Sequence, residues 1–522
     1  MPSDPEPMVA PRRYITTPIY YVNDVPHIGH AYTTIACDVY ARFMRLDGCD
    51  VFFLTGTDEH GQKVDKAAAA AGQTPQDFTD TVSRTFRDLA KTIRISNDDF
   101  IRTTEPRHHR ACGALWRRLL DAGDLYLGDY GGWYAVRDEA FYRESETTVG
   151  EDGVRRGPSG APVEWVKEPS WFFRLSAWQD RLLAFYEENP DFIAPASRRN
   201  EVISFVRSGL EDLSVSRTSF SWGVPVPGDE RHVMYVWLDA LTNYITAAGF
   251  PDETHPRWRF WPADVHVVGK DILRFHAVYW PAFLMSAGLP PPRRVFAHGW
   301  WTVEGQKMSK SLGNVVDPRE IVAAYGLDPF RFFLLREIPF GADGDFTRRG
   351  LVKRLNVDLA NEFGNLAQRT LGFIARTLGG HLPSPDLLGE DDRALLAQAE
   401  GLLPAMRVEI ARQAFHAALE GAWLVVREAN AYVDREKPWA LRRSDPVRMG
   451  TVLWVLAETL RHLAILLQPV MPDTMARLLD QLGVAETDRS FAALSRPLPG
   501  GRTLPPPEPL FRKVEETAGQ GA

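Results

Sequence analysis

The chain has 522 residues, of which 44% are apolar and 25% are charged. A chain of this length and composition can bury several hydrophobic cores, and we expect about three domains. The formal net charge of -8 argues against a generally basic nucleic-acid binder, so a nucleic-acid partner would need local basic patches.

The cysteines and the hydrophobic runs exclude several further classes. Cys37, Cys49 and Cys112 form no closely spaced pair, so neither a disulfide framework nor a zinc knuckle is predicted. The longest apolar runs, such as Trp454 to Leu456, are too short to cross a bilayer, and Met1 to Arg13 has no apolar signal core. We therefore expect no membrane segment and a reducing, cytoplasmic compartment.

The first block, from about Arg13 to Trp116, alternates between strand and helix patterns. The expected order is a strand from Tyr14 to Tyr21, a helix from His27 to Leu46, a strand from Val51 to Leu54, a loop from Gly56 to Gly61 and a helix from Gln62 to Ala71. This alternation is typical of a parallel α/β sheet. Ligands on such sheets bind at the carboxyl ends of strands, where we place the loops at 21–30 and 55–61.

A second block, from about Leu125 to Trp222, breaks that rhythm and is interpreted as an insertion with short strands. The sheet pattern then resumes in three segments, which are Tyr235 to Ala240, His266 to Asp271 and Val295 to Gly299. These segments predict a return to the parallel sheet.

The last part of the chain has helical spacing. From Asp317 the chain enters a helical connector, and beyond Leu355 the apolar residues recur at helical intervals almost throughout, which predicts a bundle. Proline-bearing breaks near 382–387 and 437–438 separate the helices. The proline-rich tail from 505 to 522 is expected to fray.

Two short motifs carry the most specific chemical signal. Lys307 to Ser311 reads Lys-Met-Ser-Lys-Ser, and the upstream segment from His27 to His30 reads His-Ile-Gly-His. The pentapeptide would occur by chance in roughly one in ten thousand chains of this length, whereas the tetrapeptide alone is a weak signal. In this order and separation they are the signature motifs of class I aminoacyl-tRNA synthetases, which this chain resembles from about residue 14 to residue 475.

The resemblance assigns catalysis to four residues, His27, His30, Lys307 and Lys310. In that family an amino-acid carboxylate attacks the α-phosphate of ATP and expels pyrophosphate, so catalysis rests on positioning and on stabilising phosphate charge. Lysines are compact point charges suited to triphosphate oxygens. The two histidines, three residues apart at a helix start, can face one phosphate, although alone they are equally compatible with an ordinary helix start.

Further ATP contacts are implied beside these four residues. Gly29 has no side chain and lets a nucleobase or ribose approach the backbone, and Ser309 can donate hydrogen bonds from the loop. Lys270 and Asp271 resemble family residues near the adenosine. For Asp271 the plainer alternative is a helix N-cap, which is compatible with the ligand role.

Within class I, the resemblance is closest to the methionyl-tRNA synthetase family. It rests on the segments 16–23, 56–61 and 235–240, and on Phe275-His276 with Trp280. A thioether pocket should be apolar and aromatic. The implied methionine-binding residues are Ile19, Tyr21, Asp58, Trp237, Ala240, Leu241, Tyr244, Phe275, His276 and Trp280. Asp58 would hold the α-ammonium group through charge-assisted hydrogen bonds, whereas Trp237 and Phe275 are almost as easily explained as core.

The C-terminal helices carry an anticodon-reading pattern of the same family. Asn365 and Arg369 are four residues apart and share a helix face, and Trp439 follows Pro438 at a helix start. Unpaired loop bases are read by stacking on aromatic rings and by hydrogen bonds to base edges, which these three residues would supply. The alternative for Trp439 is a core residue at the start of a helix.

The resemblance implies an α/β fold class: a Rossmann-like, parallel-sheet catalytic domain split by a connective insertion and followed by an all-α, helical-bundle anticodon-binding domain. The expected division is a tail at 1–12, catalytic halves at 13–116 and 225–325, the insertion at 117–224, a stem-contacting connector at 326–354, the bundle at 355–504 and a tail at 505–522.

The implied reaction is activation of methionine with ATP, followed by transfer to the terminal adenosine of initiator and elongator tRNA(Met). Mg²⁺ should accompany ATP. Many relatives carry zinc knuckles in the insertion, but Val136, Asp138 and Ala140 occupy that region here, so we expect no structural zinc. We also expect a monomer. The alternatives are another class I synthetase, such as that for cysteine, and a tRNA-binding protein without catalysis.

Overall fold

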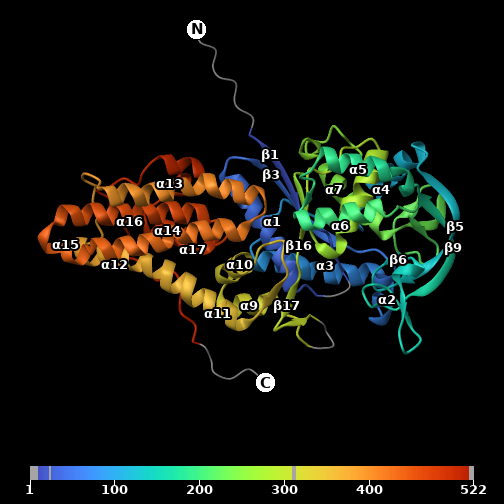
Figure 1. Cartoon of the computed structure of the whole chain (residues 1–522), viewed down its shortest axis with the longest axis horizontal. Helices are drawn as coiled ribbons and strands as arrows, with labels where there is room; N and C mark the ends of the chain where they lie inside the picture. Colours follow the sequence, from blue (N-terminus) through green and yellow to red (C-terminus); the bar gives the residue numbers. More distant parts are fainter. Residues whose placement is uncertain (1–9, 23–24, 309–312, 516–522) are drawn as a thin grey trace, which may run out of the picture. The chain divides into compact units, whose positions relative to one another are not determined.

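The computed structural model of the chain describes residues 10–22, 25–308 and 313–515 (Figure 1). The chain divides into two compact units, each built from segments that are not continuous in the sequence. The sheet unit comprises Arg13–Pro26 and Phe52–His298, and the helical unit comprises Met1–Arg12, His27–Val51 and Gly299–Ala522.

A seven-stranded sheet forms the centre of the sheet unit, with strand order β10-β16-β15-β1-β3-β2 and with β4 also paired to β3. The strands are β1 (Arg12–Thr16), β2 (Tyr20–Tyr21), β3 (Asp50–Asp58), β4 (Asp99–Arg102), β10 (Ile193–Ala194), β15 (Val265–Gly269) and β16 (Val295–His298). The pairings of β15 with β1 and β16, of β10 with β16, and of β3 with β2 and β4 are parallel. The predicted parallel α/β sheet is therefore confirmed.

The strand boundaries differ from the prediction at two places. The single strand predicted from Tyr14 to Tyr21 is wrong, because β1 ends at Thr16 and β2 begins only at Tyr20. Pro18 lies in this break and has no amide hydrogen for a ladder hydrogen bond. In contrast, β3 continues through Gly56 to Asp58, so part of the predicted loop is strand. A Cβ on Gly56 would lie 2.1 Å from the carbonyl oxygen of Ile101, so only glycine allows β4 to pack this closely.

Helices cover the sheet and bury a large aromatic core. They are α2 (Gln62–Ala70), α3 (Pro75–Thr92), α4 (Pro106–Asp121), α7 (Val236–Ala248) and α8 (Trp280–Ser286). The strand pattern predicted for 235–240 is wrong, because these residues begin α7. Nearly every residue of α7 is buried, and a short run that is mainly apolar does not by itself distinguish a buried helix from a buried strand.

The insertion contains longer strands than predicted and two helices that the sequence did not reveal. β5 (Leu125–Ala135) and β9 (Glu164–Phe173) form a long antiparallel pair (Figure 1). This pair is the centre of a four-stranded sheet, in which β6 (Ala140–Tyr142) lies beside β5 and β11 (Leu213–Ser214) lies beside β9. The helices are α5 (Gln179–Glu188) and α6 (Ala196–Arg207). The smaller strands of the insertion are β7 (Thr148–Val149), β8 (Arg155–Arg156) and β12 (Ser216–Arg217). Just beyond its predicted end lie β13 (Pro225–Val226) and β14 (Asp229–Met234), which form a small sheet with β12. Because β10 lies between α5 and α6 and pairs with β16, the insertion also contributes a strand to the main sheet.

The helical unit begins with the predicted helix at the histidine motif, α1 (Ile28–Leu46), and ends in a bundle. Between them lie a small sheet of β17 (Trp301–Val303), β18 (Gln306–Lys307) and β19 (Gly344–Phe346), and the connector helices α9 (Pro318–Tyr325), α10 (Leu327–Arg336) and α11 (Arg348–Arg354). A π-helix over Leu355–Gly364 leads into α12 (Asn365–Leu378), α13 (Glu390–Ala411), α14 (Phe415–Glu436), α15 (Pro438–Ser444), α16 (Pro446–Leu467) and α17 (Pro472–Gln481). The predicted bundle and its proline-bearing breaks are confirmed.

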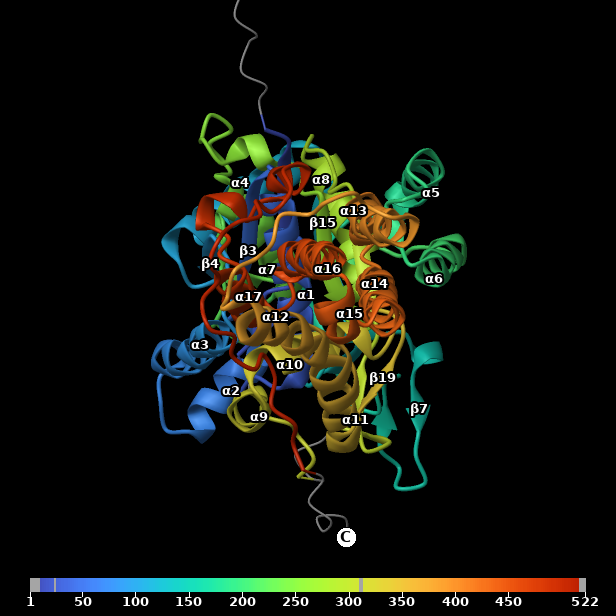
Figure 2. The ribbon, with the colours of Figure 1, turned by 90° about the vertical axis from the view of Figure 1, so that its left-hand side faces the viewer.

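One helix among the described residues, α16, is long and apolar enough to cross a membrane, which the sequence analysis did not anticipate. Its apolar 18-residue window is 100% buried within the protein. In Figure 2, which looks along the bundle, α16 lies among α12, α13, α14 and α17, and α16 packs against each of them. A helix surrounded by other helices is apolar on every face, so burial explains the composition of α16.

The described part of the C-terminal tail is held against the helical unit, so the prediction that this part frays is wrong. The side chain of Asn356 exchanges two hydrogen bonds with the backbone of Val514, at 2.8 and 2.9 Å. Arg477 donates to the carbonyl oxygen of Leu510, whose side chain is buried. These contacts offset the loss of conformational entropy when the proline-rich tail is ordered.

Candidate active site

The histidine motif forms the amino-terminal cap of α1 in the helical unit. The backbone amide of Gly29 donates to Nδ1 of His27 at 3.1 Å, and the amide of His27 donates to Nδ1 of His30 at 3.0 Å. Because Nδ1 of each ring accepts a hydrogen, the proton of each neutral imidazole lies on Nε2. Burial lowers the pKa of His30 well below its ordinary value, so this ring is neutral at neutral pH. The motif therefore presents oriented N–H donors at a helix start, where anions are favoured.

Gly29 is required by the same arrangement. A Cβ at this position would lie 2.9 Å from Cε1 of the His27 ring, which is folded back over the glycine. The sequence analysis explained Gly29 by close approach of a nucleotide. In the folded chain, packing of the neighbouring imidazole is already a sufficient reason for glycine.

The histidine motif contacts the described chain segment that follows the lysine-serine motif, within the helical unit. The amide of Ile28, at the start of α1, donates to the carbonyl oxygen of Val316 at 3.1 Å, just beyond the lysine-serine loop. Lys307 is exposed in β18, with its Nζ 5.3 Å from the ring centre of Trp300. The side chain of Asn314 donates to the carbonyl oxygen of Lys307 at 3.2 Å. Ser309 and Lys310 lie outside the described residues, so their predicted roles have no structural counterpart here.

Asp58 is the last residue of β3 in the sheet unit and is 7% exposed. Its Oδ1 atom is buried and has no hydrogen-bond partner. Burial, together with the nearby charge of Asp239, raises the pKa of Asp58 well above its ordinary value. A buried carboxylate oxygen without a donor is costly, and a cationic group bound there would remove that cost.

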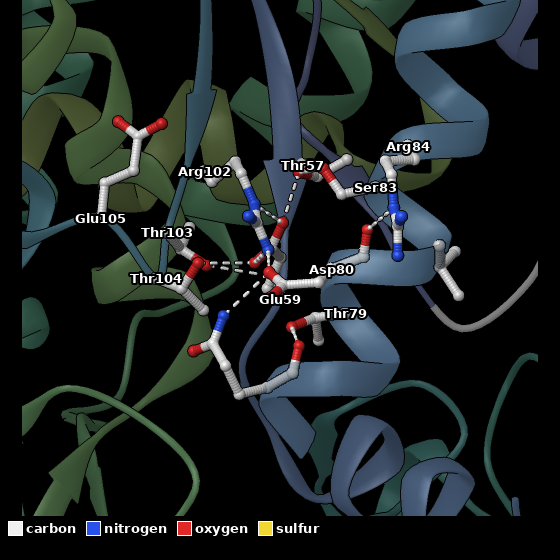
Figure 3. A network of polar contacts seen from close by, with 12 residues as sticks. Thr57, Glu59, Thr79, Asp80, Ser83, Arg84, Arg102, Thr103, Thr104 and Glu105 are labelled. Carbon is white, nitrogen blue, oxygen red and sulfur yellow. Dashed lines mark hydrogen bonds and ion pairs between the residues drawn. The ribbon is translucent and has the colours of Figure 1, made fainter. Parts of the chain in front are cut away.

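The neighbouring carboxylate, Glu59, is saturated, as Figure 3 shows. The Glu59 carboxylate accepts hydrogen bonds from Thr57 at 2.7 Å, from Thr104 at 2.6 Å, and from Nε and Nη2 of Arg102 at 2.7 and 2.8 Å. Arg102 also pairs with Asp80 on α3. Thr57 precedes Asp58 in β3 and points to the opposite face, so its hydrogen bond to Glu59 places the Glu59 carboxylate on the face away from the Asp58 side chain. The sequence analysis missed Glu59, whose only signal was its place beside Asp58.

An aromatic cluster in the sheet unit contains five of the ten predicted methionine-binding residues. The rings of Trp237 on α7 and Phe275 stack with centres 3.7 Å apart and planes 9° from parallel, and both side chains are only partly buried. The Tyr244 hydroxyl lies 2.7 Å from Nε2 of His276, and Trp280 is fully buried. Partial burial suits Trp237 and Phe275 for ligand contact, whereas Trp280 and Tyr244 lie in the core behind them.

His276 has a defined tautomer. Its Nδ1 lies 2.9 Å from the carbonyl oxygen of Ile272, which can only accept a hydrogen, so Nδ1 carries the proton. Nε2 consequently accepts a hydrogen from Tyr244. Burial lowers the pKa of His276 to about 4, so the ring is neutral at neutral pH and suits an apolar pocket. Of the other predicted pocket residues, Ile19 and Tyr21 are partly buried and Ala240 and Leu241 are buried on α7.

Lys270 and Asp271 follow β15 at its carboxyl end, where a parallel sheet binds ligands. They line a cavity of about 760 Å³ whose lining also includes Phe275. The N-cap role considered for Asp271 is wrong, because Gly269 is the N-cap of the short 3₁₀ helix and Asp271 lies inside its first turn. A Cβ on Gly269 would lie 2.4 Å from Oδ1 of Asp271, so a larger residue there would displace the Asp271 carboxylate.

A buried polar network connects helices α4 and α7 and was also missed from sequence. Asp239 lies 2.6 Å from Nδ1 of His60 and 2.6 Å from Nε2 of His108. Burial alone would raise the pKa of Asp239, but the two histidines hold it below its ordinary value. Among the described residues, His108, Cys112 and Asp239 form a cluster of metal-ligating types, with Sγ of Cys112 3.2 Å from Nε2 of His108. Two ligand atoms of one tetrahedral zinc lie about 3.3 Å or more apart. The carboxylate of Asp239 lies only 2.6 Å from Nε2 of His108, so this contact is a hydrogen bond and we assign no metal here.

The predicted anticodon residues lie in the bundle of the helical unit. Trp439 on α15 is 49% exposed, so the alternative of a core residue is wrong. The guanidinium of Arg369 lies 5.6 Å from the ring centre of Trp439 and pairs with Asp434 at 2.7 Å. Asn365 is exposed at the start of α12. The structure thus brings Arg369 and Trp439 together, as a base-stacking site requires.

Comparison with known proteins identifies the family. A model described as tRNA synthetases class I (M) matches residues 13–152 and 156–371, and one for the anticodon binding domain of methionyl tRNA ligase matches residues 382–521. The methionine–tRNA ligase of Brucella suis is 57% identical over 508 residues, covering 97% of this chain and 99% of the relative. The methionine–tRNA ligase of Mycobacterium bovis is 55% identical over 508 residues, covering 96% of this chain and 98% of the relative. The solved structure of Mycobacterium tuberculosis methionyl-tRNA synthetase with methionyl-adenylate has a TM-score of 0.95 and 54% identity, covering 96% of this chain and 99% of that one. The chain therefore belongs to the methionyl-tRNA synthetase family of class I tRNA synthetases.

Proposed function

We infer that the chain joins methionine to tRNA(Met) in two steps. Methionine and ATP form methionyl-adenylate and pyrophosphate, and the methionyl group then passes to the terminal adenosine of the tRNA. The observation that carries this function is the family match along nearly the whole chain, through both the synthetase part and the anticodon-binding part. ATP, methionine and tRNA are the substrates of this reaction.

Asp58 is proposed to bind the α-ammonium group of methionine. Its unpartnered, buried Oδ1 supports this role, because an ammonium group supplies both the missing hydrogen bond and the opposite charge. The stacked pair of Trp237 and Phe275 would contact the thioether, since sulfur packs well against aromatic rings. Ile19, Tyr21, Ala240, Leu241, Tyr244, His276 and Trp280 would complete the apolar pocket.

The phosphates of ATP are proposed to meet His27, His30, Lys307 and Lys310. Because His30 is neutral, the histidines would contribute Nε2–H hydrogen bonds, and the two lysines would contribute the positive charge. Gly29, Lys270, Asp271 and Ser309 are proposed as further ATP contacts. Neutral histidines leave phosphate charge uncompensated, which suits Mg²⁺ entering as a complex with ATP. We propose no structural zinc.

The tRNA partner is proposed to present its anticodon to Asn365, Arg369 and Trp439. The exposed Trp439 ring beneath the Arg369 guanidinium supports base stacking with a cationic neighbour. Initiator and elongator tRNA(Met) would both be substrates. A monomer, a cytoplasmic location and the seven-part division of the chain given above are part of the same proposal.

The test is amino-acid-dependent ATP–pyrophosphate exchange without tRNA, measured for all twenty amino acids. Exchange with methionine alone is expected, and Lys310→Ala should reduce it by several powers of ten while the protein stays folded. Exchange with a different amino acid would contradict the pocket assignment. Absence of exchange by folded protein would contradict the function itself.

A further inference from the structure

Glu139 lies in the insertion, and its buried carboxylate contacts Tyr21, a predicted methionine-binding residue. It precedes β6 and is 6% exposed. Its Oε1 accepts hydrogen bonds from the Tyr21 hydroxyl at 3.0 Å and from the backbone amide of Lys63 at 2.8 Å. Its Oε2 accepts a hydrogen bond from the hydroxyl of Tyr134 on β5. One side chain of the insertion thus holds the hydroxyl groups of two tyrosines.

The backbone at Glu139 is in an unfavourable conformation for a residue of this type. Its φ of 48° lies in the left-handed region, which glycine and asparagine occupy more readily than glutamate. A turn that only had to reverse the chain between β5 and β6 would favour one of those residues. The glutamate side chain at this position is therefore better explained by the contacts it makes.

Tyr21 and Asp58 occupy adjacent positions in the sheet unit. They are Cα partners in the parallel pairing of β2 and β3, so their side chains lie on the same face. Gly61 packs against this region, because a Cβ there would lie 2.9 Å from the Tyr21 hydroxyl and 3.0 Å from Oε1 of Glu139. Burial raises the pKa of Tyr21 well above its ordinary value, and the charges of Glu139 and Asp58 add to the effect, so the hydroxyl stays protonated.

A protonated tyrosine hydroxyl carries a single hydrogen and can donate it to only one acceptor at a time. It donates to Glu139, while Oδ1 of Asp58 has no donor. If the hydroxyl turned to Asp58, it would relieve that unpartnered oxygen and would compete with the ammonium group of the substrate.

We propose that Glu139 is a positioning residue that holds the Tyr21 hydroxyl away from Asp58 and so keeps the Asp58 carboxylate available for the methionine ammonium group. This inference rests on the proposed function of Asp58. It gives the insertion a direct role in methionine affinity, although the insertion contributes none of the predicted methionine-binding side chains. The competing explanation is that Glu139 only ties the β5–β6 turn to the rest of the sheet unit.

Tyr134 separates the two explanations, because it binds the other oxygen of the same carboxylate and is not one of the predicted pocket residues. Four variants of the full chain are compared with the wild type in methionine-dependent ATP–pyrophosphate exchange: Glu139→Met, Tyr21→Phe, the double variant of both, and Tyr134→Phe. Methionine has similar length to glutamate and lacks a strong acceptor. Glu139→Gln is added as the conservative variant, because its amide oxygen remains an acceptor.

Loss of one hydrogen bond to a charged group corresponds to about a tenfold change, so Glu139→Met is expected to raise KM for methionine about tenfold and to change KM for ATP less than about twofold. Tyr134→Phe should leave both values near those of the wild type, and Glu139→Gln should raise KM for methionine by about threefold or less. The decisive expectation concerns the double variant. Without the hydroxyl that competes for Asp58, its KM for methionine should fall back to that of Tyr21→Phe alone.

Three results would overturn the proposal. The first is a double variant whose KM for methionine is as high as that of Glu139→Met. The second is an increase in KM for methionine in Tyr134→Phe equal to that in Glu139→Met, and the third is an equal increase in KM for methionine and for ATP in Glu139→Met. If Glu139→Met does not fold, Glu139→Ala, which also lacks an acceptor, replaces it in the same comparison of single and double variants. Failure of the proposed function would look different, because the wild type itself would then show no methionine-dependent exchange.

Discussion

At the scale of single residues, the clearest signal is the contrast between two adjacent carboxylates. Glu59 accepts four side-chain hydrogen bonds, whereas Oδ1 of Asp58 accepts none, although both residues are buried. The fully bonded group stabilises the fold, and the unpartnered group is a cost that ligand binding can recover. A substitution at Asp58 is therefore expected to weaken methionine binding while stabilising the fold, whereas a substitution at Glu59 is expected to destabilise the fold.

Asp58→Asn should raise the melting temperature of the free protein while raising KM for methionine by roughly 10- to 100-fold, the range for a charge-assisted hydrogen bond. A carboxyl whose pKa is raised on folding binds its proton more tightly in the folded state, so its ionisation at neutral pH lowers the free energy of unfolding. For the same reason, kcat/KM for methionine in the wild type should fall on the acid side at a pH above the ordinary pKa of aspartate, about 3.9. In Asp58→Asn, kcat/KM for methionine should show no such fall at acid pH.

Glu59→Gln is the matched control at the adjacent position. It leaves Arg102 without its buried partner and should lower the free energy of unfolding by about 3 kcal/mol, as measured by urea denaturation. If Asp58→Asn were the more destabilising of the two substitutions, the assignment of Asp58 as a strained binding group would be contradicted.

At the scale of secondary-structure elements, the sequence located most helices and strands but misjudged those whose state depends on neighbours. The periodicity of α1 and of the bundle was sufficient, because long amphipathic helices repeat their pattern over many turns. The beginning of α7 was misread because it is a short run buried on almost every side, with no polar face to reveal a helical period. The two-residue strand β10 had no pattern of its own, since only its pairing with β16 makes it a strand.

The short helix α15 carries a prediction about tRNA. Trp439→Ala should raise KM for tRNA in aminoacylation by about 5- to 100-fold, because stacking of one base on an aromatic ring contributes about 1–3 kcal/mol. Methionine-dependent pyrophosphate exchange, which needs no tRNA, should be unchanged. Leu424→Ala serves as the control, because Leu424 is similarly exposed in the same unit, at 58% compared with 49% for Trp439. Equal effects of the two substitutions on aminoacylation would contradict the stacking role.

At the scale of the whole molecule, the helical unit is assembled from chain segments that lie on either side of the long segment Phe52–His298 of the sheet unit. In the helical unit, buried Arg331 on α10 pairs with Asp38 on α1 at 2.6 Å and donates to the carbonyl oxygens of Pro469 and Val470, at 2.8 and 2.9 Å. This side chain connects the helix of the histidine motif with the connector and the bundle. No local pattern in the sequence indicates such a contact.

Arg331→Met should lower the free energy of unfolding by about 3 kcal/mol, because it leaves buried acceptors without a donor and weakens the pairing of Asp38. Arg407→Met is the matched control: Arg407 pairs with Asp47 over a similarly long sequence separation in the same unit, but its side chain is 50% exposed. That substitution should change the free energy of unfolding by less than about 1 kcal/mol. Urea denaturation of both variants provides the comparison, and equal losses would contradict the importance of burial.

The sequence by itself determined the family, the α/β class, the bundle and the two signature motifs, because these depend on local periodicity and on short runs of reactive residues. Only the tertiary structure decided which polar groups are satisfied and which are not. The saturated Glu59, the pair of histidines around Asp239 and the contact of Glu139 with Tyr21 all join side chains from separate elements. Hydrogen bonding is short-ranged in space but not along the chain. The availability of Asp58 for a ligand is therefore a property of the folded protein alone.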